Sequence, residues 1–135
     1  MRVDTRRLML LASALVLGAA AAAAWNQFDA RADRFARARM AVGGDPVRGA
    51  RLMAARGCAA CHDIPGIRPS GAQVGPSLEG LATRPFLAGQ IRNRPDHLIA
   101  WITDPKGIEP GTAMPDLGIT EGEARDMATY LYAQP

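Results

Sequence analysis

Two cysteines and a histidine stand together in the run Cys58-Ala59-Ala60-Cys61-His62. The chain has only these two cysteines, and their spacing, with histidine directly after, is that of a covalent haem attachment site. Two thiols three positions apart can form thioethers with the two vinyl groups of one haem, and the adjacent histidine then lies under the iron as its proximal ligand. The motif therefore predicts one covalently bound haem c.

Two other uses of the cysteine pair fit the sequence less well. A thioredoxin-like thiol–disulfide pair belongs to a βαβ pattern, which the flanking residues do not show. A structural zinc ion takes four ligands in tetrahedral geometry, and beyond the motif only His97 remains as a nitrogen donor. Haem attachment is the interpretation that we carry forward.

Met114 is our predicted second axial ligand of the iron. It lies in the run 111–115, a turn-rich loop that Pro115 stiffens, and it has no helical stripe to join. Methionine is more often a core filler, which is our interpretation of Met53 and Met127. The competing ligand, His97, falls on the first turn of a helix, where we expect a surface residue. Methionine–histidine ligation raises the reduction potential of the iron.

The element that leads into the cysteine motif is a predicted helix. Asp45-Pro46 has the form of an N-cap followed by proline at the first helical position, and Gly57 ends the helix. The positions that recur with helical spacing, and that we expect to be buried, are Val47, Ala50, Met53 and Ala54.

Further helices are predicted downstream of the motif, and no alternating strand pattern of any length is present. A short helix is expected over 78–84 and a clear one over 96–103. Thr120 with Glu123 has the form of a capping box that opens a last helix. The expected buried stripe of that helix is Ala124, Met127, Ala128 and Leu131.

Two long loops, 63–77 and 104–119, separate these helices and are rich in proline and glycine. Loops of this length are unusual in a compact domain. They are explained if both wrap around a large cofactor, which also supplies the core volume that so small a domain lacks.

The charge is distributed unevenly along the chain, whose net charge is +3. Residues 1–25 carry a net +2 and residues 26–44 another +2, whereas residues 45–135 carry a net −1. A nucleic-acid interface requires clustered Lys and Arg on the folded domain. We therefore expect no nucleic-acid partner.

Residues 1–25 are predicted to be a signal peptide or a signal anchor. Leu8–Trp25 contains no charged residue, and Arg6-Arg7 precede it. The small residues of 19–24 permit cleavage, whereas an uncharged stretch that extends to Phe28 has the length of a bilayer span. We favour a retained anchor with its N-terminus inside.

Residues 26–44 are predicted to be a helical linker that Gly43-Gly44 ends. Phe28, Phe35 and Met40 form no continuous apolar stripe, so we interpret the segment as a solvated spacer. The alternative is a basic segment that contacts lipid phosphates beside the anchor. The domain itself is then 45–135.

The sequence resembles the class I, mitochondrial-type cytochromes c, and most of all the short membrane-attached cytochromes that accompany bacterial respiratory oxidases. The resemblance covers nearly all of 45–132. The stretches that carry it are GARLMAARGCAACH, DIPGIRPSGAQVGPSLEGLATR, HLIAWITDP and PGTAMPDLGITEGEARDMATYLY.

This resemblance implies a small all-α fold of three to four helices around one covalent haem, preceded here by the N-terminal hydrophobic helix. It implies that the first and last helices of the domain cross at small residues, with Gly49 against the Tyr130/Leu131 region. It further implies that the carbonyl of Pro76 accepts a hydrogen bond from His62. Trp101 and Arg84 match positions that lie near the haem propionates in relatives.

The function implied is single-electron transport in a respiratory chain, from a quinol-oxidising complex or a dehydrogenase to a terminal oxidase. With His62 and Met114 both on the iron, no position is open for a small-molecule substrate, so we expect an electron carrier and not an enzyme, either by itself or as a subunit of an oxidoreductase complex. We expect it on the periplasmic side of the bacterial cytoplasmic membrane. The alternative is a haem-based gas sensor or weak peroxidase, in which Met114 leaves the iron readily.

Overall fold

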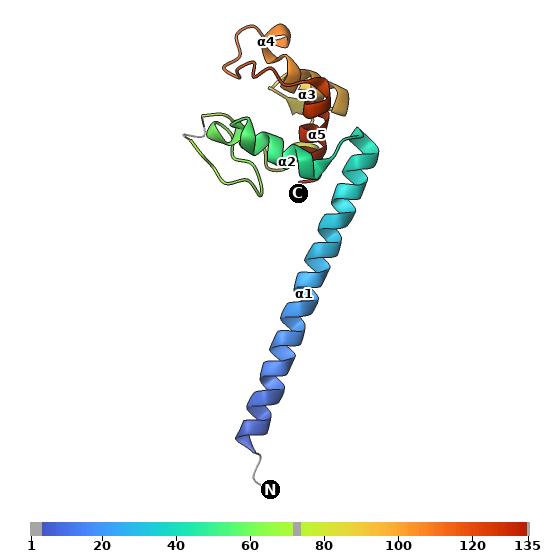
Figure 1. The fold of residues 1–135 in the computed structure, drawn as a ribbon, viewed down its shortest axis with the longest axis vertical. Coiled ribbons are helices and arrows are strands. Elements are labelled where there is room, and N and C mark those ends of the chain that lie inside the picture. Colours follow the sequence, from blue (N-terminus) through green and yellow to red (C-terminus); the bar gives the residue numbers. More distant parts are fainter. Residues whose placement is uncertain (1–3, 72–73, 135) are drawn as a thin grey trace. The chain divides into compact units, whose positions relative to one another are not determined.

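The computed structural model describes residues 4–71 and 74–134, and in this part of the chain most residues are helical (Figure 1). The all-α fold class expected from the sequence is thus confirmed. The chain divides into two compact units, Met1–Asp33 and Arg34–Pro135. Arg2, which contributes to the basic N-terminal charge, and residues 72–73 of the first long loop lie outside the described residues.

The first unit consists of the N-terminal part of helix α1 (Thr5–Val42). An 18-residue window of this helix has a mean hydropathy of 2.1, and none of that window is buried inside the structure. By length and composition the helix is able to cross a membrane, a property that signal sequences share.

The last turns of α1 belong to the second unit and pack into its core. Phe35, Ala38 and Val42 lie at helical spacing, Ala38 and Val42 are buried, and Phe35 packs against the buried cluster. The Phe35 ring meets the ring of Tyr130 edge-on, with centroids 6.4 Å apart and an interplanar angle of 67°. The segment 26–44 is therefore helical up to Val42, but its second half is not the solvated spacer that we expected.

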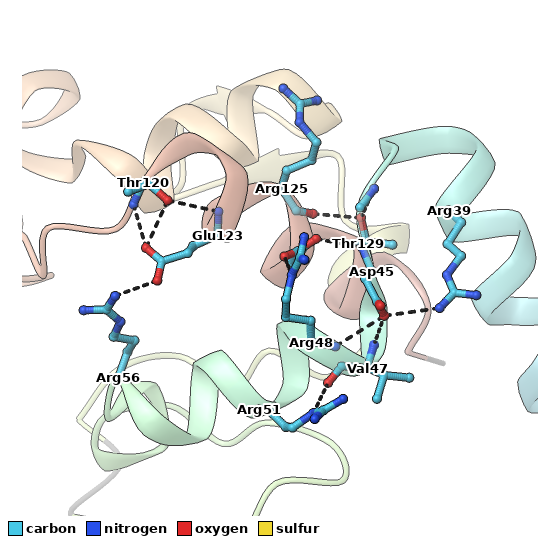
Figure 2. A network of polar contacts seen from close by, with 12 residues as sticks. Arg39, Asp45, Val47, Arg48, Arg51, Arg56, Thr120, Glu123, Arg125 and Thr129 are labelled. Atoms are coloured by element: carbon cyan, nitrogen blue, oxygen red, sulfur yellow. Dashed lines mark hydrogen bonds and ion pairs between the residues drawn. The ribbon is translucent and has the colours of Figure 1, made fainter.

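The chain between α1 and helix α2 (Pro46–Ala55) is fastened to the last helix by polar contacts (Figure 2). The N–H of Gly44 donates to Thr129 Oγ1 at 3.1 Å, and the N–H of Asp45 donates to Asp126 Oδ1 at 2.7 Å. Arg48 forms an ion pair with the other oxygen of Asp126, a side chain only 2% exposed. The predicted N-cap is confirmed, since the Asp45 carboxylate accepts two backbone N–H groups of the first turn. Those two hydrogen bonds lower the pKa of Asp45.

Helix α2 crosses helix α5 (Glu121–Tyr132) at Gly49. A Cβ added at Gly49 would stand 2.1 Å from the carbonyl oxygen of Asp126 and 2.9 Å from the backbone nitrogen of Met127. The crossing on Gly49 was expected, but its partner lies about one helical turn before the Tyr130/Leu131 region. The close approach places the backbones, and not side chains, in contact.

The buried face of α2 is rotated from the predicted one. Pro46, Gly49 and Met53 are buried, whereas Val47 is 45% exposed and Ala54 is exposed. The prediction counted only large or apolar side chains. The glycine, which has none, marks the centre of the contact because it lets the two helices approach.

Helix α5 forms as predicted. Thr120 Oγ1 accepts a hydrogen bond from the N–H of Glu123 at 3.3 Å, and Glu123 Oε2 accepts one from the N–H of Thr120 at 3.0 Å, which completes the capping box. The four residues of its predicted stripe are all buried: Ala124, Met127, Ala128 and Leu131.

The middle of the domain contains one clear helix and several short elements. Helix α3 (Pro95–Thr103) is confirmed and packs against α5. The helix expected over 78–84 is reduced to a single 3-10 turn, η2 (Leu81–Thr83). The second long loop contains one helical turn, α4 (Pro105–Ile108).

A short antiparallel hairpin, which the sequence did not predict, precedes α3. Strand β1 (Phe86–Leu87) pairs with β2 (Ile91–Arg92), with Phe86 opposite Arg92 and Leu87 opposite Ile91. The turn between them has positive φ at Ala88 (46°) and Gly89 (79°), as the tight turns of hairpins require. Two residues per strand are too few for an alternating pattern to show.

Candidate functional site

The cysteine–histidine segment is one compact turn. Gly57 adopts the left-handed conformation, with φ of 76°, and ends α2 directly before the 3-10 helix η1 (Cys58–Ala60). The N–H groups of Cys61 and His62 both donate to the carbonyl of Cys58, at 3.2 and 3.0 Å. Both thiols and the imidazole thus arise from a single turn whose backbone is fixed by its own hydrogen bonds.

Cys58 and Cys61 are both free thiols and are both half-buried. Burial raises the pKa of the Cys58 thiol, and the neighbouring Cys61 raises it further, whereas a backbone hydrogen bond at Cys58 itself opposes the shift. Before haem is attached, the Cys58 side chain is therefore a protonated thiol at neutral pH. It is available for a covalent bond at the edge of the core.

The imidazole of His62 is held by the loop that follows. Its Nδ1 lies 2.7 Å from the carbonyl oxygen of Pro76. A carbonyl can only accept, so Nδ1 is the donor, and the neutral tautomer that this contact selects has its lone pair on Nε2. The ring also packs on Gly75, where an added Cβ would stand 2.7 Å from His62 Cε1. This is the arrangement that a metal-ligating histidine needs, with one nitrogen tied to a carbonyl and the other open to iron.

Backbone hydrogen bonds tie the same loop along the whole cysteine–histidine segment. The N–H of Ser70 donates to the carbonyl of Ala59 at 3.0 Å, and that of Gly75 donates to the carbonyl of Cys61 at 2.8 Å. The N–H of Leu78 donates to the carbonyl of Asp63 at 2.7 Å. The position of Pro76 relative to His62 is therefore set on both sides of the proline.

The resemblance places Arg84 near the haem propionates. In the structure its guanidinium donates hydrogen bonds to backbone carbonyls. Its Nη2 donates to the carbonyl of Ser77 at 2.7 Å and to that of Glu79 at 2.5 Å. The side chain is half-buried. Arg84 therefore holds the chain directly after Pro76, whatever its remaining N–H groups contact.

The other predicted site residues lie on separate elements. Trp101 is half-buried on α3, and Met114 is half-buried in the loop between α4 and α5, where its N–H donates to Thr112 Oγ1 at 3.2 Å. Within residues 4–71 and 74–134, no hydrogen bond links Trp101 or Met114 to His62. His97, the competing ligand, donates from Nδ1 to the carbonyl of Arg92 at 2.9 Å.

Comparisons with known proteins give this arrangement a family. The family described as Cytochrome c matches residues 46–134, which is most of the chain. The chain belongs to the cytochrome c family. It is similar to the cytochrome c oxidase subunit 2 of Alkalihalophilus pseudofirmus, with 31% identity over 85 residues that cover 62% of this chain and 24% of that protein. Against the cytochrome c oxidase subunit 2 of Bacillus sp. strain PS3, identity is 27% over 111 residues, which cover 78% of this chain and 31% of that protein.

The chain thus spans between 24% and 31% of the length of these curated relatives. Cytochromes c carry a covalently bound haem with iron, so the cofactor expected from the sequence is confirmed by the family. The residues present fit this group, because the described turn offers two free thiols and an imidazole with one open nitrogen.

No competing metal site is built by the described residues. In residues 4–71 and 74–134, no three histidine, cysteine or acidic side chains gather as a metal-binding group. A surface groove of about 570 Å³ does lie in this cytochrome c domain, between the end of α1, α3 and α5. None of the predicted haem residues lines it, so it is separate from the haem chemistry.

Sequence reasoning missed three residues that support the site. Gly75 makes room for the His62 ring, and the half-buried side chains of Asn93 and Tyr132 hydrogen-bond to each other behind Arg84. Gly75 stands in a Gly-Pro pair, which was a usable signal. Asn93 and Tyr132 are isolated polar residues that belong to no motif and no periodic pattern, so nothing in the sequence points to them.

Proposed function

We propose that this cytochrome c transfers single electrons through a haem bound to Cys58 and Cys61, with His62 and Met114 as the two axial ligands of the iron. The observation that carries the proposal is the 2.7 Å hydrogen bond between His62 Nδ1 and the carbonyl of Pro76. His62 is the residue directly after the attached cysteine Cys61. The hydrogen bond leaves Nε2 as the only nitrogen of the ring that is free for iron.

The side chains and backbone of this protein bind and orient the haem. Haem c, when bound, supplies the reversible one-electron change at iron. Cys58 and Cys61 fix the cofactor covalently, and Pro76 holds the His62 ring in one tautomer and one orientation. Met114 would be the second protein ligand of the iron, which would raise the reduction potential and leave no place for a substrate there. Trp101 and Arg84 are the side chains proposed for the propionate side.

We further propose that the domain works in respiration at the outer face of the bacterial cytoplasmic membrane. Both relatives reported above are oxidase subunits, and the apolar part of α1 has the length of a bilayer span. A retained anchor raises the concentration of the domain near membrane partners. Electrons would then pass from a quinol-oxidising complex or a dehydrogenase to a terminal oxidase.

The ligand set is tested on the full-length protein purified in detergent. On a denaturing gel the haem stain should coincide with the protein band. The ferric protein should show the weak charge-transfer band of methionine–iron ligation. M114L should abolish that band while haem stays attached. The matched control is M40L, because Met40 is 81% exposed. Survival of the band in M114L would exclude Met114 as the ligand. Rapid CO binding to the reduced wild-type protein would favour the gas-sensor or peroxidase alternative.

The respiratory assignment is tested in native membranes. The haem, once reduced, should be re-oxidised when oxygen is admitted, and an inhibitor of the terminal oxidases should block this re-oxidation. A haem that stays reduced while the oxidases consume oxygen would rule out the terminal oxidase as its acceptor. A haem-stained band of full length in the membrane fraction is expected if the anchor is retained.

A further inference from the structure

Asn93, in the chain between β2 and α3, is the centre of a hydrogen-bonded group behind the haem-binding loop. Its Nδ2 donates to the carbonyl of Leu81 at 2.6 Å and to the carbonyl of Arg84 at 2.8 Å. Its Oδ1 accepts from the hydroxyl of Tyr132 at 2.6 Å, and Tyr132 lies on the last turn of α5. One side chain thus joins the C-terminal helix to the segment 81–84.

The chemistry of the partners allows only one orientation of this amide. Two backbone carbonyls can only accept, so the amino group of Asn93 must face them. The carbonyl oxygen of Asn93 must then face Tyr132, whose hydroxyl donates. Burial raises the pKa of Tyr132, and the nearby Asp96 adds to this, so the phenol keeps its proton well above neutral pH. An aspartate at position 93 would place a carboxylate oxygen against the carbonyl oxygens of Leu81 and Arg84, which cannot donate a hydrogen bond. The amide of asparagine is therefore required here.

Arg84 extends the connection towards the axial histidine. While its own carbonyl accepts from Asn93, its guanidinium donates to the carbonyls of Ser77 and Glu79. Ser77 follows Pro76 directly in the chain. A continuous path of hydrogen bonds and backbone therefore runs from α5 to the carbonyl that holds His62.

We propose that Tyr132 and Asn93 are positioning residues for the axial histidine: they fix Arg84, which holds the loop that presents the Pro76 carbonyl to His62 Nδ1. This inference rests on the proposed role of His62 as an iron ligand. It assigns to the C-terminal helix a second contribution, besides its packing on α2 at Gly49, to the same haem site.

The consequence concerns the electronic state of the ligand. A short hydrogen bond from Nδ1 makes the imidazole a more basic ligand, and a more basic ligand favours ferric over ferrous iron. When the loop after Pro76 loses part of its support, the mean distance from Nδ1 to the carbonyl increases and the ligand becomes less basic. Loss of the Tyr132 hydroxyl should therefore raise the reduction potential.

The experiment compares Y132F with Y130F in the full-length haem-loaded protein. Tyr130 is the matched control because it lies on the same helix and its hydroxyl donates to the opposite end of the same loop, at 2.5 Å from the carbonyl of Pro65, eleven positions before Pro76. Both variants keep the ring and lose one hydroxyl. The readouts are the NMR resonance of the His62 Nδ1 proton in the ferrous state, the exchange rate of the Leu78 amide, the midpoint potential and the denaturation midpoint.

We expect both variants to be less stable, but only Y132F to change the histidine. In Y132F the His62 Nδ1 proton should move upfield, the Leu78 amide should exchange about fivefold faster, and the potential should rise. N93D should shift the His62 Nδ1 resonance and the Leu78 exchange rate in the same directions by larger amounts, whereas its added carboxylate charge separately lowers the potential. An unchanged His62 resonance in Y132F and N93D, with an unchanged potential in Y132F, would overturn the proposal and leave the contact with a structural role alone. Equal changes in Y130F would overturn it as well.

Failure of this inference is distinguishable from failure of the proposed function. If His62 is not an iron ligand, the wild-type protein itself will lack the ring resonances that ligation to haem shifts, and the absorption spectrum of reduced, native H62A will match that of the wild type. If His62 is the ligand and the inference fails, the wild-type resonances will be present and Y132F will leave them in place.

Discussion

Replacement of Gly49 by alanine tests whether contact between the backbones of α2 and α5 controls the stability of this cytochrome c. The added Cβ would stand 2.1 Å from the carbonyl oxygen of Asp126 and 2.5 Å from its carbonyl carbon, whereas real Cβ contacts stay beyond 3.0 Å. The atoms in the way belong to a helix backbone, so no side-chain rotation relieves the overlap. The helices must separate by about 1 Å, which is a severe case of overpacking.

We expect this separation to destabilise the domain by about 3 kcal/mol, the upper end of the usual overpacking cost. That loss corresponds to roughly a hundredfold change in the unfolding equilibrium. It also weakens the hydrogen bond from the N–H of Asp45 to the Asp126 carboxylate, which spans the two helices at 2.7 Å. For a domain of this size the melting temperature should fall by about 12–24 °C.

The assay is guanidinium denaturation of the full-length haem-loaded protein in detergent, followed by circular dichroism and by haem absorbance in parallel. Coincident transitions establish two-state behaviour. The matched control is G122A on α5, because a Cβ at Gly122 meets nothing within 4 Å. G122A should leave stability unchanged or raise it by up to about 1 kcal/mol. A G49A protein as stable as the wild type would refute the argument that backbone contact sets the crossing.

Three further outcomes are expected. M114A should lower the reduction potential and open the iron to CO, measured by redox titration and CO difference spectra; an unchanged potential would contradict the ligand assignment. A88G should stabilise the domain by about 1 kcal/mol in the same denaturation assay, because alanine at a φ of 46° is strained, and no gain would show that the turn relaxes. The pKa of Glu123 is lowered by its backbone hydrogen bond with Thr120 and by Arg56, so the stability that its carboxylate contributes is present above its unfolded pKa of about 4.3 and is lost as pH falls through the lowered value. E123Q should therefore differ from the wild type at pH 7, and the difference should shrink as pH falls through the lowered pKa of Glu123; a difference that stays constant as the pH is lowered into the acid range would contradict the sign.

Local chemistry made several elements predictable. The N-cap at Asp45 and the capping box of Thr120 and Glu123 depend only on residues within three positions of each other, and both are present in the structure. The buried stripe of α5 followed from helical spacing, because most of that helix is surrounded by other elements.

The errors arose where contact depends on the absence of a side chain or on a partner far along the chain. The buried face of α2 centres on Gly49, which contributes nothing to an apolar pattern. The end of α1 was expected to be a solvated spacer, because Phe28, Phe35 and Met40 form no continuous apolar stripe. The burial of that end depends on α5, whose Tyr130 ring meets Phe35.

The haem chemistry of this cytochrome c could be predicted from the sequence alone. The motif from Cys58 to His62 predicts covalent haem attachment within five consecutive residues, and a local motif needs no tertiary information to be recognised. The tertiary structure alone decided how the site is supported. The tie of His62 to Pro76 through Ser77 and Arg84 rests at its far end on Asn93 and Tyr132, which are 39 positions apart in the chain. Only the packing of α5 brings those two side chains together, because hydrogen bonds over such separations depend on the whole fold and not on local spacing.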